Sequence, residues 1–216
     1  AKRAVSRIRD LMSLSAASTT DTPDPRPAED SGAAASGRET PISGWGHYPT
    51  VVGREVYGEN LEELTRGAVL SRGAGKSYGD ASLPPRGASR PVVNTVLADR
   101  ILSFDPETGV IRVEAGLFLR RLHHVFIPRG WFTPVTPGTQ LLTIGGMVAS
   151  DVHGKGHHVD GCFGEHVLSL KLRVADGRIV ECSDEEERDL FRATLGGMGL
   201  TGHILEVEFR LRRIPS

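Results

Sequence analysis

Glycine is concentrated in three separated segments of this chain, and this pattern limits its fold more than any other feature. The segments are residues 73–79, 137–146 and 196–202, in a chain of 216 residues with 26 glycines. Glycine allows tight turns and close approach of the backbone to another surface, because it has no side chain. The pattern therefore predicts either tight turns alone or a main chain packed closely against a ligand.

The first segment lies in the stretch VLSRGAGKSYGD, residues 69–80, which resembles a phosphate-binding loop. The nucleotide loop G-x-x-x-x-G-K-[ST] would end at Gly75-Lys76-Ser77 and would need its first glycine at position 70. That position is Leu70. The stretch is therefore not typical of an ATP- or GTP-binding loop.

A second glycine pattern, GMGLTG at residues 197–202, matches the dinucleotide fingerprint G-x-G-x-x-G by letter. The Rossmann geometry requires a strand before this pattern and a helix after it. Here an expected helix precedes it and an expected strand follows, so a nicotinamide-binding interpretation fails. These glycines form a tight helix-to-strand turn, make room for a flat ligand, or do both.

Turn and cap signals divide the ordered part of the chain into a mixed order of strands and helices. Strands are expected at residues 69–73, 91–95 and 203–214, and hairpins at 101–116 and 167–183. Helices are expected after an Asn60 cap, over 117–126, over 143–154, and after a capping box of Ser183 and Glu186. This order predicts an α+β fold rather than a regular βαβ repeat.

Residues 1–43 are rich in small, polar and acidic residues and in proline, which predicts a flexible N-terminal tail before an ordered domain over residues 44–214. The formal net charge is −1 and there is no basic stripe, so nucleic acid is not an expected partner. No apolar run is long enough to span a bilayer. The 2 cysteines are too few for a disulfide framework.

Histidines gather with one cysteine in the stretch HGKGHHVDGCFGEH, residues 153–166. Histidine and cysteine are zinc ligands, but this spacing matches no common structural zinc pattern, and we expect no metal. Two interpretations remain open. Some of these histidines face a ligand, or the segment is a surface loop that is rich in histidine.

The three glycine-rich segments together favour an extended ligand. A mononucleotide needs one such loop, whereas a dinucleotide needs contacts at its pyrophosphate, its ring system and its adenosine end. Main-chain N–H groups at glycine turns and helix N-termini bind anions without side-chain bulk. Thr143 and Gly145-Gly146, at the start of the expected helix over 143–154, are suited to bind an anion in this way. The residues therefore indicate a ligand such as FAD, bound between two lobes.

The stretches SRGAGKSYGD, TPGTQLLTIGGMVASDVHGKGHHVDGCFGEHV and GGMGLTGHI together resemble the FAD-binding domain of the vanillyl-alcohol oxidase/p-cresol methylhydroxylase (PCMH) family. Within that family, the sequence is most similar to the decaprenylphosphoryl-ribose 2′-oxidase subfamily, and the stretch GWGHYPTV fits it too. The resemblance covers residues 44–214 and implies a two-subdomain α+β fold with FAD between the subdomains. It also implies a substrate-binding domain that is not among these residues.

The resemblance implies three sets of cofactor-binding residues. The first set wraps the FAD pyrophosphate and comprises Ser71, Arg72, Gly73, Ala74, Gly75, Lys76, Ser77, Tyr78, Gly79 and Asp80. Further cofactor contacts are implied for Gly138, Thr143, Ile144, Gly145, Gly146 and Ile204. A third set, near the flavin ring, comprises His153, Gly154, Lys155 and Gly156. Some family members bond the flavin covalently through a histidine at the position of Lys76, so the lysine implies non-covalent FAD.

The implied activity is FAD-dependent oxidation of a secondary alcohol of a sugar. In this subfamily the 2′-hydroxyl of a lipid-phosphate-linked ribose becomes a ketone by hydride transfer to flavin N5. His153 is the candidate catalytic residue on the substrate side. The implied partners are a small-molecule or lipid-linked sugar and a reductase that completes an epimerisation in cell-wall biosynthesis. The implied location is the cytoplasm, with peripheral membrane contact. The alternative is a non-catalytic FAD-binding module or subunit.

Overall fold

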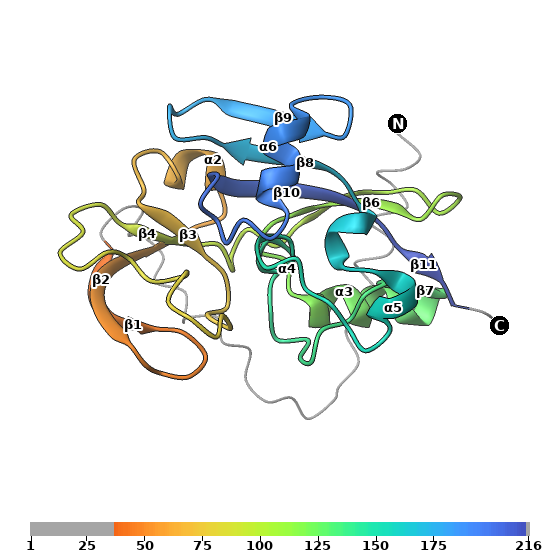
Figure 1. The fold of residues 1–216 in the computed structure, drawn as a ribbon, viewed down its shortest axis with the longest axis horizontal. Coiled ribbons are helices and arrows are strands. Elements are labelled where there is room, and N and C mark those ends of the chain that lie inside the picture. The colour runs from red at the N-terminus through yellow and green to blue at the C-terminus, as the bar shows by residue number, and fades with distance from the viewer. Residues whose placement is uncertain (1–36, 215–216) are drawn as a thin grey trace.

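The computed structural model describes residues 37–214, which form two main sheets with short helices beside and between them (Figure 1). The first sheet has the strand order β1-β2-β4-β3. Its first two strands form an antiparallel hairpin, whereas β4 pairs in parallel with both β2 and β3. The strands are β1 (Arg38–Ser43), β2 (Thr50–Tyr57), β3 (Leu70–Arg72) and β4 (Val92–Asn94).

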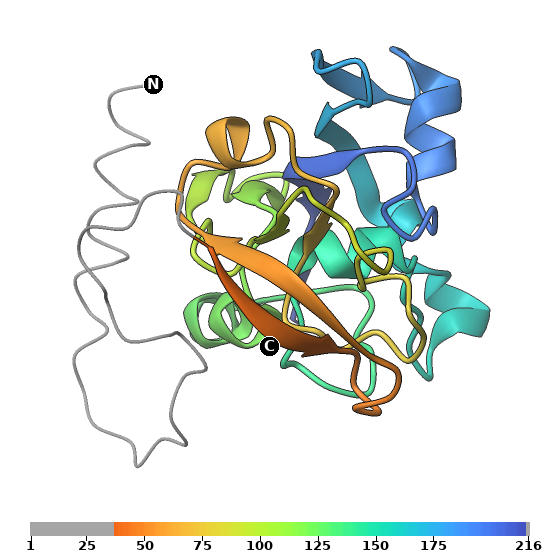
Figure 2. The same cartoon turned by 90° about the vertical axis from the view of Figure 1, so that its left-hand side faces the viewer.

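The second sheet has the order β5-β6-β10-β8-β9 and is antiparallel throughout. Figures 1 and 2 show the two sheets on different sides of the molecule, with β3 of the first next to β10 of the second. The strands are β5 (Ile101–Phe104), β6 (Val110–Glu114), β8 (Val167–Arg173), β9 (Ile179–Ser183) and β10 (His203–Arg210). A small separate pair is formed by β7 (Trp131–Phe132) and β11 (Arg212–Arg213).

Both predicted hairpins are confirmed, and the turn residues explain them. Asp105 accepts hydrogen bonds from the Glu107 N–H and the Thr108 hydroxyl in the β5–β6 turn. Asp176 accepts one from the Arg178 N–H in the β8–β9 turn. Aspartate in a turn uses its short side chain to bond the backbone two residues on, which fixes the reversal of the chain.

The helices are short and lie mostly on the second sheet or at its edges. Asn60 caps α2 as predicted, because its side chain accepts from the Glu63 N–H. The predicted helix over 117–126 is present as α3, and Gly130 ends the following turn in the left-handed conformation. The helices are α2 (Leu61–Leu64), α3 (Leu119–Phe126), η1 (Ile127–Arg129), α4 (Ile144–Ala149), α5 (His157–Asp160), η2 (Phe163–His166) and α6 (Arg188–Thr194).

Three of the sequence-based boundaries are wrong. The expected tail over 1–43 ends too late, because β1 pairs with β2 from Arg38 onward; residues 1–36 lie outside the described residues. The helix expected over 143–154 is only α4, because Asp151 takes a positive φ of 39°. The expected capping box does not open α6. Instead the Ser183 hydroxyl accepts from Glu185 and Glu186 in a turn, and the helix begins one turn later.

The main hydrophobic core lies on one face of the second sheet, where α4 packs on β6 and β10. Its fully buried side chains include Phe126, Met147, Phe163 and Phe209. A smaller cluster of Ile42, Leu83 and Val92 supports the first sheet. Because the large core fixes α4 against β10, it also fixes the positions of the residues at the ends of these two elements.

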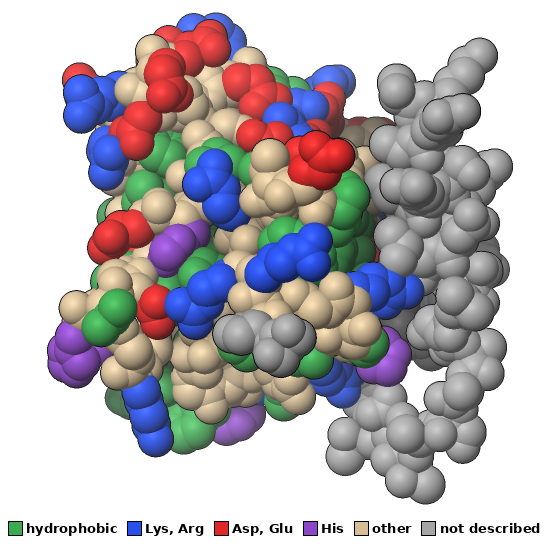
Figure 3. Space-filling model, turned by 90° about the vertical axis from the view of Figure 1, so that its right-hand side faces the viewer, with side chains coloured by type: hydrophobic (Ala, Val, Ile, Leu, Met, Phe, Trp, Pro, Cys, Tyr) green, Lys and Arg blue, Asp and Glu red, His purple; other side chains and the backbone are tan. Residues whose placement is uncertain are grey.

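Charge is mixed over the described surface. Figure 3 shows acidic side chains gathered at the end formed by β9 and α6 and basic side chains across the middle of the same face. The acidic end includes the run from Asp184 to Asp189. Among the described residues, no helix is both long and apolar enough to cross a membrane.

The junction of the two sheets leaves no room for a side chain at Gly116. An added Cβ would lie 1.8 Å from Thr95 O and 2.6 Å from Ala98 O. We therefore expect Gly116→Ala to lower the free energy of unfolding by about 2 kcal/mol or more, because backbone must shift to relieve the overlap. Gly46→Ala is the matched control, since an added Cβ there meets no atom within 4 Å. Equal urea midpoints for the two variants would contradict this account of the junction.

Candidate functional site

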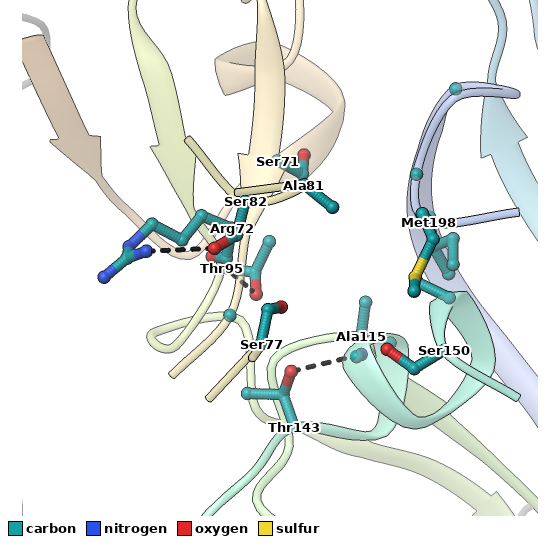
Figure 4. A pocket seen from close by; sticks show the side chains of 17 residues that line it. Ser71, Arg72, Ser77, Ala81, Ser82, Thr95, Ala115, Thr143, Ser150 and Met198 are labelled. Atoms are coloured by element: carbon teal, nitrogen blue, oxygen red, sulfur yellow. Dashed lines mark hydrogen bonds between the residues drawn. The ribbon is translucent and has the colours of Figure 1, made fainter. Parts of the chain in front are cut away.

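The three glycine-rich segments meet at one small cleft of about 80 Å³ between β3, α4 and β10, which we call the central cleft (Figure 4). The predicted site residues that line it are Ser71, Arg72, Gly73, Ser77, Thr143, Gly145, Gly146 and Ile204. The third segment contributes Met198, Gly199 and Gly202, which were expected to lie near the ligand only as part of that segment. Sequence reasoning missed the other lining residues, which are Ala81, Ser82, Thr95, Ala115, Ala149 and Ser150. Segments more than a hundred residues apart in sequence therefore form one site.

The loop over residues 73–79 presents main-chain donors that no protein group uses. Within residues 37–214, the N–H groups of this loop donate no hydrogen bond to another part of the chain. The loop is nevertheless held in place, because the Trp45 N–H donates to Ser77 O at 3.0 Å. Tyr78 also packs edge-on against the Trp45 ring. Successive free N–H groups in a fixed turn form a concave anion-binding surface.

The side chain of Arg72 supports this loop from behind rather than entering the cleft. Its Nη2 donates to Ser43 O at 2.8 Å, and its Nη1 donates to the Ser82 hydroxyl at 3.2 Å. Its Nε lies 3.3 Å from Glu55 Oε1 as an ion pair, without hydrogen-bond geometry. Figure 4 shows Arg72 directed away from Met198. Arg72 therefore faces the cleft through its backbone only.

Gly75 turns the loop over this guanidinium. Its φ is +64°, and an added Cβ would lie 2.3 Å from Arg72 Nη2. Both facts require glycine, because other residues rarely adopt this conformation and none would fit. The role of Gly75 in the structure is therefore to shape the loop.

The start of α4 differs from the predicted anion site. The N–H groups of Ile144 and Gly145 donate to Leu117 O and Ala115 O, so they are already used. Ile144 is fully buried, so its side chain lies in the core and not in the cleft. What remains at the cleft is the Thr143 hydroxyl, which caps the helix by accepting from the Gly146 N–H at 3.3 Å.

The third segment forms the opposite wall of the cleft. Met198 and Gly199 both have positive φ, of 52° and 79°, in the turn between α6 and β10. The predicted helix-to-strand turn is therefore confirmed, and the same turn also lines the cleft. Behind it, His203 Nδ1 lies 2.8 Å from the Ser71 hydroxyl oxygen, which joins β10 to β3.

His203 is a functional candidate that sequence reasoning missed, because a lone histidine on a strand carries no signal of its own. Burial, together with the nearby Arg173 and Arg90 guanidinium groups, lowers the pKa of His203 from 6.5 to about 4. The imidazole is therefore neutral near pH 7. Arg173 cannot move away, since its guanidinium donates to the Thr65 hydroxyl and to two backbone carbonyls, Glu62 O and Gly177 O.

A larger cavity of about 640 Å³ is lined by the whole third predicted set and by Gly138 of the second, and we call it the His153 cavity. Gly138, His153, Gly154, Lys155 and Gly156 all line it. Its remaining lining residues are Phe132, Pro134, Val135, Thr136, Pro137, His157, Asp160, Gly161 and Arg212. An ion pair of 2.7 Å between Arg212 and Asp160 spans its wall and joins α5 to β11.

The histidine cluster packs ring against ring, in one edge-on and one tilted contact. The rings of His153 and His157 lie 5.3 Å apart, and those of His157 and His158 lie 4.0 Å apart. His166 turns away and bonds Asp160 O at 2.8 Å. Among residues 37–214, no group of three His, Cys, Asp or Glu side chains is placed to hold a metal ion.

A third cavity of about 630 Å³, here called the side pocket, adjoins the central cleft and shares Ser71, Ala81, Met198 and Gly199 with it. Its walls are mostly apolar, and Asp80 lies at its edge. Six predicted residues line none of the three cavities described here; these are Ala74, Gly75, Lys76, Tyr78, Gly79 and Ile144. Five of them, all except Ile144, still belong to the loop over residues 73–79 that presents free N–H groups.

An α+β fold whose glycine segments meet at a cleft with free main-chain donors is typical of a protein that binds a phosphate-bearing cofactor. Residues 64–183, more than half of the chain, match the family model described as FAD binding domain. The chain therefore belongs to this family of FAD-binding domains, of the PCMH type, and its cofactor is FAD. The predicted family, fold class and cofactor are thus confirmed.

Several curated proteins are similar to the chain. It is 40% identical over 164 residues to decaprenylphosphoryl-beta-D-ribose oxidase of Mycolicibacterium smegmatis, covering 76% of this chain and 35% of that protein. It is 33% identical over 150 residues to a putative D-arabinono-1,4-lactone oxidase of Neurospora crassa, covering 69% and 26%. It is 33% identical over 109 residues to L-gulonolactone oxidase of Mus musculus, covering 50% and 24%. The chain thus spans about a third or less of the length of these relatives.

The depressed pKa of His203 predicts a pH dependence of stability. The unfolded chain takes up a proton on this histidine near pH 6.5 and the folded chain only near pH 4, so the free energy of unfolding falls as pH decreases across that window. In His203→Asn this contribution is absent. We expect the melting temperature of wild type to fall more steeply than that of His203→Asn between pH 7 and pH 5. Parallel curves in differential scanning fluorimetry would contradict the burial of a neutral His203.

Proposed function

We propose that this chain is the FAD-holding part of an oxidoreductase that oxidises a secondary alcohol of a sugar. The proposed substrate is a lipid-phosphate-linked ribose, whose 2′-hydroxyl becomes a ketone. One observation carries the cofactor part of the proposal: three separate segments meet at the central cleft, beside a loop of unused N–H groups. The similarity to a ribose oxidase supports the sugar part.

The residues of the cleft fit a dinucleotide diphosphate. The free N–H groups of residues 73–79 would bind phosphate oxygens, and the Thr143 hydroxyl would add a donor from the other side. No protein atom close to Gly138 or Gly146 explains why these positions need glycine. An added Cβ at Gly138 would meet no atom within 4 Å, and one at Gly146 would meet only Thr143 Oγ1, at 3.2 Å. Open space beside a glycine in a cavity wall is what a closely packed ligand needs.

We propose the following orientation for the cofactor. We place its diphosphate in the central cleft and its adenosine end toward the turn at Met198–Gly199. The flavin end then lies toward the His153 cavity, where Gly154 and Lys155 line the wall. We propose that the FAD is held non-covalently, because the position that carries the linking histidine in some family members is Lys76.

The proposed chemistry follows from the placement of the flavin and the sugar at the His153 cavity. When bound, FAD would supply the hydride-accepting chemistry for oxidation of the carbinol carbon. His153 would accept the proton of the same hydroxyl, since its ring lines the cavity in which we place the sugar. The Lys155 ammonium would stabilise negative charge that develops beside it. The apolar wall around Pro134 and Val135 would keep water from the reacting atoms.

The proposed partners follow from the proposed substrate. A lipid-linked sugar brings the protein to a membrane surface, so we propose peripheral contact by a cytoplasmic protein. A reductase that returns hydride to the other face of the ketone would complete an epimerisation. The second candidate function is an FAD-binding module without catalysis, which needs only the central cleft and its loop of unused N–H groups.

The cofactor proposal predicts that a methyl group at Gly146 obstructs FAD. We expect Gly146→Ala to weaken FAD binding by about tenfold or more, because forcing a methyl into a filled site costs about 1–3 kcal/mol. Its melting temperature without cofactor should not fall, because the added Cβ contacts only the Thr143 hydroxyl. Gly46→Ala is the matched control, outside all three cavities. Unchanged FAD affinity by fluorescence titration of Gly146→Ala would place the cofactor elsewhere.

The catalytic proposal predicts that substrate bleaches the flavin. We expect a lipid-phosphate-linked ribose to remove the visible flavin absorbance of the FAD-loaded chain without oxygen, and the 2′-deoxy analogue to leave it unchanged. His153→Asn should slow bleaching by about a hundredfold, the usual contribution of a proton acceptor. His158→Asn, which does not line the cavity, should not. A loaded chain that no sugar alcohol bleaches would instead support the non-catalytic module.

A further inference from the structure

A hydrogen bond between the two sheets lies at the wall of the proposed cofactor site. Ser71 belongs to β3 of the first sheet, and His203 belongs to β10 of the second. Ser71 Oγ and His203 Nδ1 are 2.8 Å apart. Ser71 lines both the central cleft and the side pocket, so it lies where the two cavities meet. Figure 4 shows its side chain among those around the central cleft.

The surroundings of His203 keep its ring neutral and in place. His203 is paired directly opposite Arg173 of β8, so the two side chains leave the sheet on the same face. The Arg173 guanidinium is buried and fixed by its donation to Thr65 Oγ1, at 2.9 Å, and to Gly177 O, at 2.5 Å. A fixed cation beside a half-buried imidazole disfavours a second positive charge.

A neutral imidazole has one N–H group. Which ring nitrogen carries it decides whether the Ser71 hydroxyl presents a hydrogen-bond donor or an acceptor to the cleft. If the proton is on Nδ1, the ring donates to Ser71 Oγ, and the hydroxyl proton is free to point into the cleft. If the proton is on Nε2, Ser71 must donate to Nδ1, and its oxygen lone pairs face the cleft. An anion is favoured by the first arrangement and repelled by the second.

The cleft next to Ser71 is built for an anion, since the loop of free N–H groups begins two residues later. We propose, on the basis of the proposed function, that His203 is a positioning residue for the cofactor. It donates from Nδ1 to Ser71 Oγ, so that the Ser71 hydroxyl donates to a phosphate oxygen of FAD. Cofactor binding selects the Nδ1–H tautomer.

Two isosteric substitutions test this role of His203. The amide of asparagine reaches the position of Nδ1, whereas that of glutamine reaches the position of Nε2. We expect Ser71→Ala and His203→Gln each to weaken FAD binding by about tenfold or more, the usual effect of losing a hydrogen bond to a charged group. His203→Asn should stay within about threefold of wild type. The measurement is the dissociation constant for FAD, by fluorescence titration of the full chain.

The double variant separates positioning from a general effect on the fold. If His203 acts through Ser71, Ser71→Ala/His203→Gln binds FAD no more weakly than Ser71→Ala alone. Additive losses would overturn the proposal, as would equal affinities for Asn and Gln at position 203. Melting temperatures without FAD show which variants fold. If a His203 variant does not fold, Ser71→Ala, which removes only one hydroxyl, still tests whether the Ser71 hydroxyl binds FAD.

The controls also separate this inference from the function on which it rests. A wild-type chain that binds no FAD contradicts the proposed function. A wild-type chain that binds FAD, with Ser71→Ala and His203→Gln equal to it, contradicts the positioning role alone.

Discussion

The close approach of the loop at residues 73–79 to the start of α4 is the contact on which the rest of the site depends. An added Cβ at Gly73 would lie 2.3 Å from Thr143 Oγ1, so the Gly73 backbone packs directly against the Thr143 side chain. The core holds α4 against β10, and β4 holds β3 in the first sheet. The contact therefore joins the two subdomains at the point where the loop exposes its unused N–H groups. A diphosphate supplies several acceptor oxygens to such groups at once.

Much of the fold could be predicted from local chemistry, and the failures share a cause. The hairpins at Asp105 and Asp176 and the cap at Asn60 were predictable because short polar side chains bond their own backbone. The strand β1 was not, because its sequence lies in a polar, alanine- and proline-rich region and gains its order from pairing with β2. The length of α4 was not either, since Asp151 leaves the helix and its carboxylate oxygen accepts a hydrogen bond from the Gly164 N–H. Tertiary contacts decided both cases.

The candidate site shows the same division. Glycine segments could be recognised, and they do meet, because glycine marks close approach whatever the distance in sequence. The partners of each segment could not be read from the chain. Ile144 followed the glycine pattern yet lies in the core, and the N–H groups at the start of α4 bond Leu117 O and Ala115 O. His203 gave no signal, because its role depends on Ser71, 132 positions away. The sequence shows which backbone segments are rich in glycine, whereas only the fold shows which of their N–H groups have no hydrogen-bond partner.

The arrangement separates cofactor binding from substrate choice. The loop is shaped before any ligand arrives, since Arg72 and Trp45 hold it from behind, and a preformed site loses little conformational entropy on binding. The three relatives are named for a ribose, an arabinonolactone and a gulonolactone, yet each shares only 24% to 35% of its length with this chain. The FAD binding domain covers more than half of this chain, so the similarity supports cofactor binding more directly than it supports any one sugar.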